Sequence, residues 1–313
     1  MGLDRRLLRG ARCARRHRRH VRPEPLGRRS DPGVEIHGTG AGVSTTGKLD
    51  GKVAFITGGA RGQGRSHALR LAGEGADIIA VDICEDYETT AYPMATEEDL
   101  EQTAKEVRAL GRRVVTRKAD VRDRGQLEAA LTGGVAELGR LDIVVANAGI
   151  CVLGAWDEVT PRVWQDTLDT NLTGAWNTIT VAVPHLVRAG GGSVIATGST
   201  CGVKGNPFFA PYVAAKHGLV GVARTLANEL AQHHIRVNVV HPAGVVTELT
   251  HGLARIGELI ETNPRLGGAF VNALPVERLE PGDVSNAVLF LASDDAKFMT
   301  GAELVVDAGN TIF

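Results

Sequence analysis

Three polar side chains in the second half of the chain have types and spacing suited to moving a proton. Tyr212 and Lys216 lie four residues apart in a helical pattern, so their side chains share one helix face. Ser199 ends an apolar run thirteen residues before Tyr212. A phenol is a weak base at neutral pH, but a nearby ammonium stabilises the phenolate and lowers the pKa of the phenol. We expect Tyr212 to take the proton of a secondary alcohol while Ser199 holds the alcohol oxygen.

The Tyr–Lys pair alone also has a plain explanation, since solvated helix faces often carry both residue types at this spacing. The case for catalysis therefore depends on whether the chain also binds a cofactor. The apolar run VAFIT (53–57) passes directly into TGGARGQG (57–64) and a helical pattern. Glycines there allow a tight turn and a close approach to a pyrophosphate, and the helix N-terminus offers free N–H groups. The run predicts a dinucleotide-binding turn that uses Gly58, Arg61, Gly62, Gln63 and Gly64.

An acidic residue indicates which dinucleotide binds. Asp82 lies eighteen residues after Gly64, at the end of a second apolar run, where a carboxylate accepts both ribose hydroxyls of adenosine. A 2′-phosphate there would cost on the order of 4 kcal/mol, because like charges would lie about 4 Å apart. Arg61 favours a 2′-phosphate, but an exposed ion pair contributes only about 0–1 kcal/mol. We therefore expect NAD rather than NADP.

Seven short apolar runs alternate with longer amphipathic stretches in the body of the chain. Nearly continuous apolar runs are typical of strands that are covered on both faces. The alternation predicts one doubly wound α/β domain of the Rossmann type over residues 48–313, with a seven-stranded parallel sheet and helices on both faces. The expected strands are residues 53–57, 77–82, 113–120, 142–148, 192–198, 235–241 and 303–307. Residues 248–280 lack strand signals and are expected over the carboxyl edge of the sheet.

Two further groups of residues follow expected strands and are predicted to contact the cofactor. Asp120 and Val121, at the end of the third strand, are placed to meet the adenine. Asn147, Ala148 and Gly149, after the fourth strand, would shape the floor under the nicotinamide ribose.

The motifs together resemble those of the short-chain dehydrogenase/reductase family. TGxxxGxG (57–64), NAG (147–149), Asn171, the Ser199–Tyr212–Lys216 spacing and HPAGVVT (241–247) occur in the order that the family uses. The resemblance covers about residues 50–313. Two residues depart from the usual pattern: Gln63 replaces a branched apolar residue, and Ala243 separates Pro242 from Gly244.

The resemblance implies a role for each matched residue. Tyr212 is the acid/base, and Lys216 holds the nicotinamide ribose and tunes the tyrosine. Ser199 orients the substrate, and Asn171 positions a water that links Lys216 to a proton relay. The carboxamide of the nicotinamide would meet Pro242, Gly244, Val245 and Thr247. The family resemblance also implies a homotetramer.

An acidic segment, CEDYETTAYPMATEEDL (84–100), lengthens the link between the second strand and the next helix. That helix is expected to start near Thr96, with Asp99 completing a capping pattern. The insertion at about 84–99 resembles that of the mycofactocin-associated, carveol dehydrogenase-like enzymes, which implies tightly held NAD and mycofactocin as electron acceptor. We expect a clasp over the nucleotide; the alternative is a surface elaboration without cofactor contact. Tyr87 and Tyr92 are not expected to be catalytic.

Charge is divided unevenly along the chain. Residues 1–47 hold eleven arginines against four acids, so this segment carries +7 while the remainder carries −8. We interpret residues 1–47 as a disordered extension, or as the product of a start assigned upstream of a true beginning near Val43. A nucleic-acid arm and a targeting leader are the alternatives, and nucleic acid is not an expected partner.

Cysteine spacing and hydropathy narrow the class of protein. The four cysteines lack the spacing of a zinc site or a disulfide framework, so we expect no metal and a reducing, cytoplasmic compartment. No apolar run approaches 18 residues, so no membrane partner is expected. We expect Trp156, Trp164 and Trp176 to pack the long helices.

The expected substrate pocket is apolar. Its walls would be Cys151, Leu153, Cys201, Phe208, Phe209 and the segment 249–270. The predicted function is NAD-dependent oxidation of a lipophilic, terpenoid-like secondary alcohol, or reduction of its ketone. An NADPH-dependent ketoreductase is the alternative of the same class. A nucleotide-binding scaffold without catalysis is the alternative of another class.

Overall fold

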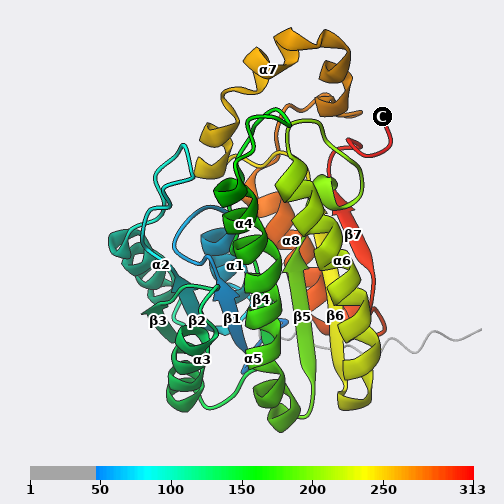
Figure 1. Ribbon diagram of the computed structural model, residues 1–313. Coiled ribbons are helices and arrows are strands. Elements are labelled where there is room, and N and C mark those ends of the chain that lie inside the picture. Colours follow the sequence, from blue (N-terminus) through cyan, green and yellow to red (C-terminus); the bar gives the residue numbers. More distant parts are fainter. Residues whose placement is uncertain (1–46) are drawn as a thin grey trace, which may run out of the picture. The chain divides into compact units, whose positions relative to one another are not determined.

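The computed structural model describes residues 47–313. The predictions made for the arginine-rich segment therefore lie outside the described residues, apart from Gly47. Seven parallel strands form one sheet in the order β3-β2-β1-β4-β5-β6-β7, which confirms the predicted sheet (Figure 1). The strands are β1 (Val53–Thr57), β2 (Asp77–Asp82), β3 (Val114–Lys118), β4 (Ile143–Ala146), β5 (Gly192–Thr197), β6 (Ile235–Pro242) and β7 (Glu303–Val306).

Helices connect the strands and cover both faces of the sheet. They are α1 (Gly62–Ala72), α2 (Glu97–Ala109), α3 (Arg124–Leu138), α4 (Pro161–Leu168), α5 (Gly174–Ala189), α6 (Ala210–Leu230), α7 (Ile256–Thr262) and α8 (Pro281–Ala292). Helix α2 begins as predicted: the Thr96 hydroxyl accepts from the Asp99 amide, and the Asp99 carboxylate accepts from the Thr96 amide. This reciprocal cap satisfies two amides that the helix itself leaves unpaired.

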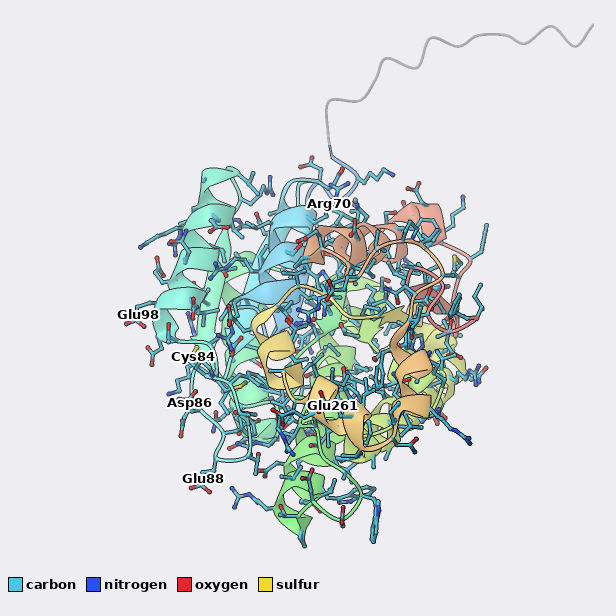
Figure 2. All side chains as sticks on the ribbon, turned by 90° about the horizontal axis from the view of Figure 1, so that it is seen from above. Arg70, Cys84, Asp86, Glu88, Glu98 and Glu261 are labelled. Carbon is cyan, nitrogen blue, oxygen red and sulfur yellow. The ribbon has the colours of Figure 1, made fainter. Side chains whose placement is uncertain are left out.

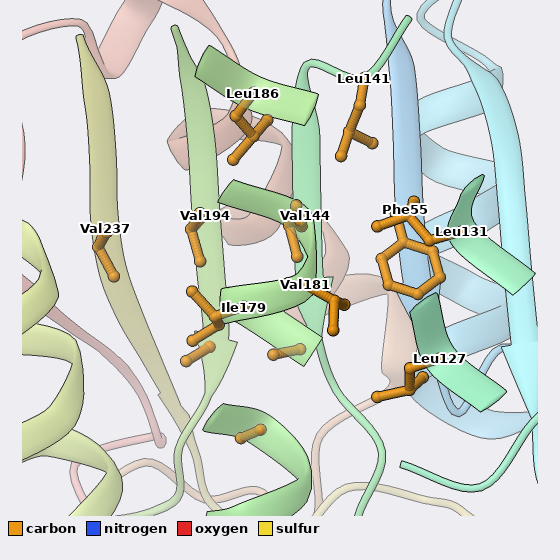
Figure 3. Packing of buried hydrophobic residues seen from close by; sticks show 14 of the residues in the cluster. Phe55, Leu127, Leu131, Leu141, Val144, Ile179, Val181, Leu186, Val194 and Val237 are labelled. Atoms are coloured by element: carbon orange, nitrogen blue, oxygen red, sulfur yellow. The ribbon is translucent and has the colours of Figure 1, made fainter. Parts of the chain in front are cut away.

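Two apolar layers hold the sheet between the helices. Strands β1 and β2 are buried along their whole length, which explains their uninterrupted apolar sequences. One layer joins the sheet to α3, α5 and α6, and Figure 3 shows Phe55 beside Leu131 and Val194 beside Ile179 within it. The other joins the opposite face to α1, α2 and α8. Each fully buried side chain of this size contributes about 1.5–3 kcal/mol.

The strand order reverses beside β1, which pairs with both β2 and β4. In doubly wound sheets, ligands bind in the crevice outside the carboxyl ends of the strands at such a point. Figure 2 looks onto this edge: Cys84, Asp86 and Glu88 of the insertion lie on the α2 side, and α7 with Glu261 lies across the middle. Residues 248–270, which lack strand signals in the sequence, form α7 with short 3₁₀ turns on either side. No helix between residues 47 and 313 is long and apolar enough to cross a membrane.

Candidate active site

The turn after β1 is shaped by glycines that no other residue could replace without movement. Gly58 and Gly62 have φ angles of +67° and +55°, in the left-handed region that favours glycine. A Cβ at Gly64 would lie 1.8 Å from the Gly58 carbonyl oxygen. The result is an open backbone cradle at the N-terminus of α1, which suits a pyrophosphate.

A cavity of about 140 Å³ opens above this turn. All the residues predicted for the adenosine and pyrophosphate end line it: Gly58, Arg61, Gly62, Gln63, Gly64, Asp82, Asp120 and Val121. The residues predicted for the floor under the nicotinamide ribose, Asn147, Ala148 and Gly149, line it as well. The Oε1 atom of Gln63 is buried and has no hydrogen-bond partner within residues 47–313. A glycine cradle, a buried carboxylate and an unpaired polar atom together fit a dinucleotide.

Asp82 ends β2 with 8% of its surface exposed. Its carboxylate accepts from the Ala60 amide at 3.1 Å and from the Cys84 amide at 3.4 Å. Burial raises the pKa of Asp82, and these amides oppose the rise. Arg61 donates to the Pro93 carbonyl of the insertion, so its guanidinium is tied to this segment and not left to pair with a 2′-phosphate.

The Asn147 turn is fastened to the end of β1. The Asn147 side-chain amide donates to the carbonyl oxygens of Thr57 and Gly58, at 3.0 and 3.3 Å. The Thr57 hydroxyl accepts from the amides of Asn147 and Ala148, at 3.2 and 3.3 Å. These bonds fix the spacing of two strand ends between which a nicotinamide ribose would lie.

The three predicted proton-handling residues meet at one cavity of about 290 Å³. Ser199 follows β5, while Tyr212 and Lys216 lie on successive turns of α6. The Lys216 ammonium donates to the Thr197 carbonyl at 2.6 Å and lies 5.4 Å from the centre of the Tyr212 ring. The Ser199 hydroxyl accepts from the Cys201 amide at 3.1 Å.

Burial dominates the electrostatics of this trio. It raises the pKa of Tyr212 well above its usual value; Cys151 and Cys201 add to the rise, and Ser199 opposes it. Burial also lowers the pKa of Lys216 to about 8. In the protein alone, burial therefore holds the pKa of Tyr212 above its usual value. The predicted lowering by Lys216 together with the positive charge of an oxidised cofactor stays a prediction.

Asn171 lies in a π-helical turn, Asp169–Thr173, that joins α4 to α5. Such turns are frequent at functional sites, and nothing in the sequence had indicated one. The Asn171 amide donates to the carbonyl oxygens of Ile150 and Thr167, both at 2.9 Å. Its buried Oδ1 has no partner in the described part of the chain. An unpaired buried acceptor is compatible with the predicted water, and the relay stays a prediction.

The predicted carboxamide-binding motif lies between the two cavities. Pro242 ends β6, and Pro242, Gly244, Val245 and Thr247 line the larger cavity. Gln63, Asn147, Gly149, Thr247 and Leu249 line both cavities. The two cavities are therefore continuous, as an extended dinucleotide with a substrate at one end would need.

The insertion lines the cavity above the glycine-rich turn, which favours a clasp over a surface elaboration without cofactor contact. Tyr87, Tyr92, Met94 and Ala95 line this cavity. The Tyr92 hydroxyl accepts from the Cys151 amide at 3.1 Å, and that of Tyr87 lies 3.0 Å from the Thr170 hydroxyl. The Arg122 guanidinium lies 4.4 Å from the centre of the Tyr87 ring. Both tyrosines hold the insertion against the walls of the site.

The substrate side follows the predicted apolar list in part. Cys151, Cys201, Phe209 and the segment around Phe270 line the larger cavity, whereas Leu153 and Phe208 pack in the cluster behind them. The prediction for the tryptophans is wrong. Trp156 is 88% exposed, and Trp164 and Trp176 are about two-fifths exposed, because α4 and α5 turn these rings away from the core.

Comparison with known proteins agrees with this geometry. A family model described as Enoyl-(Acyl carrier protein) reductase matches residues 58–311. The (−)-trans-carveol dehydrogenase of Rhodococcus erythropolis is 47% identical over 274 residues, which are 85% of this chain and 99% of that protein. The chain belongs to the short-chain dehydrogenase/reductase family.

Two solved structures of this family resemble the fold closely. One is a short-chain dehydrogenase from Mycobacterium paratuberculosis bound to NAD: the identity is 46%, the TM-score 0.84, and the match covers 85% of this chain and all of that one. The other is carveol dehydrogenase from Mycobacterium avium in complex with NAD, with 47% identity, a TM-score of 0.81, and coverage of 86% and 100%. The chain is thus an oxidoreductase of this family whose relatives bind NAD.

Proposed function

We propose that this short-chain dehydrogenase/reductase interconverts a lipophilic secondary alcohol and its ketone with NAD. The observation that carries the proposal is the meeting of Ser199, Tyr212 and Lys216 in a cavity that shares walls with the glycine-lined nucleotide cavity. Apolar side chains, among them Phe209 and Phe270, line part of the larger cavity. The carveol dehydrogenase relative supports a terpenoid-like alcohol as the substrate class.

The chain's own residues divide the proton chemistry. Bound NAD would supply the hydride acceptor and, in its oxidised form, a positive charge near Tyr212. The Ser199 hydroxyl holds the substrate oxygen, and Tyr212 exchanges a proton with it. A raised pKa keeps Tyr212 protonated, which suits donation to a ketone; removing a proton from an alcohol needs the positive charge of Lys216 and of the cofactor. Asn171 Oδ1 would hold the water of the proton relay.

Asp82 and Arg61 support NAD over NADP. The Asp82 carboxylate is buried against backbone amides, so a 2′-phosphate would meet a fixed negative charge. Arg61 is engaged with the Pro93 carbonyl. Turnover with each cofactor separates this proposal from an NADPH-dependent ketoreductase, and a clear preference for NADPH would reject the Asp82 argument.

The insertion supports a cofactor that dissociates slowly. Its two buried tyrosines and the Arg61–Pro93 bond form a cover over the nucleotide cavity, which we call the clasp (residues 84–96). A retained cofactor must be reoxidised in place, and we propose mycofactocin as the electron acceptor. Denaturing the purified protein should release about one NAD per chain; protein without bound nucleotide would count against retention.

The assembly and compartment are part of the same proposal. We propose a homotetramer in the cytoplasm. The exposed Trp164 on α4 and Trp176 on α5 offer aromatic surface that subunit contacts would cover. Cys84, Cys151 and Cys201 are free thiols, which fits a reducing compartment. Light scattering of the purified protein measures the assembly directly.

The decisive test of catalysis uses (−)-trans-carveol and carvone as probes. Formation or loss of NADH absorbance, with Tyr212→Phe as the inactive control, distinguishes an enzyme from a nucleotide-binding scaffold. A wild-type rate in Tyr212→Phe would refute the assignment of the acid/base.

A further inference from the structure

His241 is a fully buried histidine, one residue before the end of β6, and it lines neither cavity. Its ring lies against the turn that carries Ser199. The Nδ1 atom is 2.7 Å from the Ser199 carbonyl oxygen and 3.2 Å from the Ser199 backbone nitrogen. The proton chemistry proposed above makes no use of this side chain, although it contacts the residue that holds the substrate oxygen.

Two glycines leave the space that the ring occupies. A Cβ at Gly198 would lie 2.7 Å from Nδ1 of His241, and a Cβ at Gly202 would lie 3.1 Å from Cε1. Neither glycine has a φ angle in the left-handed region, so backbone conformation does not explain them. The glycines on either side of Ser199, Thr200 and Cys201 therefore leave room for the imidazole; Gly198 also lies close to Val239, and Gly202 close to the Lys216 carbonyl oxygen.

Glu303 borders the ring on its other side. His241 Nε2 lies 3.2 Å from a carboxylate oxygen of Glu303, the first residue of β7, and the same carboxylate pairs with Arg224 of α6. Burial lowers the pKa of His241, as does Lys216, while Glu303 and the Ser199 carbonyl oppose this. We assign the proton of the neutral ring to Nδ1, because the shortest contact is to a carbonyl oxygen, which can only accept. A second proton on the ring would lie on Nε2 and face Glu303. Both the neutral and the charged imidazole therefore keep the hydrogen bond from Nδ1 to the Ser199 carbonyl oxygen.

We infer that His241 is a positioning residue for Ser199, an inference that rests on the proposed function. The bond from Nδ1 fixes the Ser199 backbone in its extended conformation, with φ −176° and ψ 162°. This conformation holds the serine between the end of β5 and the 3₁₀ turn Thr200–Gly202. A misplacement of about 1 Å at a reacting group can cost about 10²-fold in rate.

Two substitutions of similar polarity test the inference. Asparagine places its amide at the position of Nδ1, so His241→Asn keeps a donor for the Ser199 carbonyl. Glutamine places its amide near Nε2, so His241→Gln faces Glu303 and leaves that carbonyl unpaired. In single turnovers with carveol, with rates normalised to bound NAD, we expect His241→Asn to stay within about threefold of wild type. His241→Gln should lose about tenfold or more in the maximal rate of hydride transfer, with little change in the carveol concentration that gives half of that rate.

A purely structural role would give another pattern. It would lower the thermal stability and the folded fraction of both variants, but not the rate per bound NAD. Equal normalised rates for His241→Gln and His241→Asn would overturn the inference. Loss of carveol turnover in the wild type, or full activity of Tyr212→Phe, would reject the proposed function instead.

A crystal structure of each variant gives a readout that does not depend on activity. We expect the Ser199 hydroxyl to keep its place relative to Tyr212 in His241→Asn and to shift in His241→Gln. If His241→Gln does not fold, Gly198→Ala disturbs the same contact from the serine side, because its Cβ would lie 2.7 Å from Nδ1 of the ring, and equally close to a side-chain carbon of Val239. An undisplaced serine in either disturbed variant would overturn the inference.

Discussion

Tyr92 is buried and Tyr212 is partly buried, and burial raises the pKa of both, but we propose different roles for them. For each, burial is the first cause of the rise in pKa. The Tyr92 hydroxyl accepts a hydrogen bond from the Cys151 amide and so helps to hold the clasp in place. The Tyr212 hydroxyl lines the larger cavity beside Ser199, with the Lys216 ammonium near its ring. Burial alone therefore does not identify a catalytic phenol. The groups that the hydroxyl faces are the better guide.

The largest expected effect separates the two tyrosines directly. Tyr212→Phe removes the proton donor, so we expect hydride transfer to fall by about 10²–10⁴-fold while bound NAD is retained. Tyr92→Phe is the matched control, because it removes a hydroxyl of the same type from the neighbouring nucleotide cavity, and its single-turnover hydride transfer should stay near wild type. Single-turnover NADH absorbance measures both. Similar rate losses in the two variants would break the comparison.

Tyr92→Ala tests the structural role of the clasp. Truncating a buried aromatic side chain costs about 3–5 kcal/mol, and here the loss falls on the wall of the nucleotide cavity and on the segment next to Gly252. We expect NAD to dissociate faster by at least tenfold, or about 1.4 kcal/mol. Trapping released NAD with a second dehydrogenase measures the rate. An unchanged rate with the fold intact would remove the clasp from the account of retention.

The difference between these tyrosines also shows which features of the fold and of the site could be predicted from the sequence. The sheet follows from uninterrupted apolar strands and one glycine-rich turn, which are local signals. Tyr212 and Lys216 were placed by their spacing on one helix. In contrast, the π-helical turn at Asn171, the bond from Arg61 to Pro93 and the contact of His241 with Ser199 depend on tertiary packing. The tryptophan prediction failed for the same reason, because helical spacing does not show which face meets the core.

Lys216 provides the third test. Its ammonium lies near the Tyr212 ring, whereas no lysine is among the described residues that line the cavity of Tyr92. The pKa of Lys216 is lowered to about 8 in the folded chain, so the charged lysine destabilises the fold fully below pH 8. This penalty fades as pH rises from about 8 to the unfolded value, near 10.5. A pKa shift of this size corresponds to a loss of about 3 kcal/mol in the free energy of unfolding. Replacing the lysine removes this loss, but it leaves the Thr197 carbonyl without its hydrogen bond, which costs about 1–2 kcal/mol.

With NAD removed from both proteins, we therefore expect the free energy of unfolding of Lys216→Met to exceed that of wild type by about 1–2 kcal/mol at pH 7. This difference should disappear as pH approaches 10. Hydride transfer by Lys216→Met should fall, because the phenolate of Tyr212 loses its ammonium. Denaturant unfolding at several pH values measures the first effect. An advantage that grew with pH would contradict the assignment of a buried charge.

The smallest expected effect lies within the clasp itself. Tyr87 shares the burial of Tyr92, but its ring also lies beneath Arg122, so part of its attachment does not depend on the hydroxyl. Tyr87→Phe removes only the bond to Thr170, worth about 0.5–1.5 kcal/mol, and keeps the aromatic face for the guanidinium. We expect NAD dissociation to rise by about two- to tenfold, less than in Tyr92→Ala, with kcat unchanged. A larger effect from Tyr87→Phe than from Tyr92→Ala would mean that the clasp is held at Thr170, beside the π-helical turn, and not at the Cys151 end.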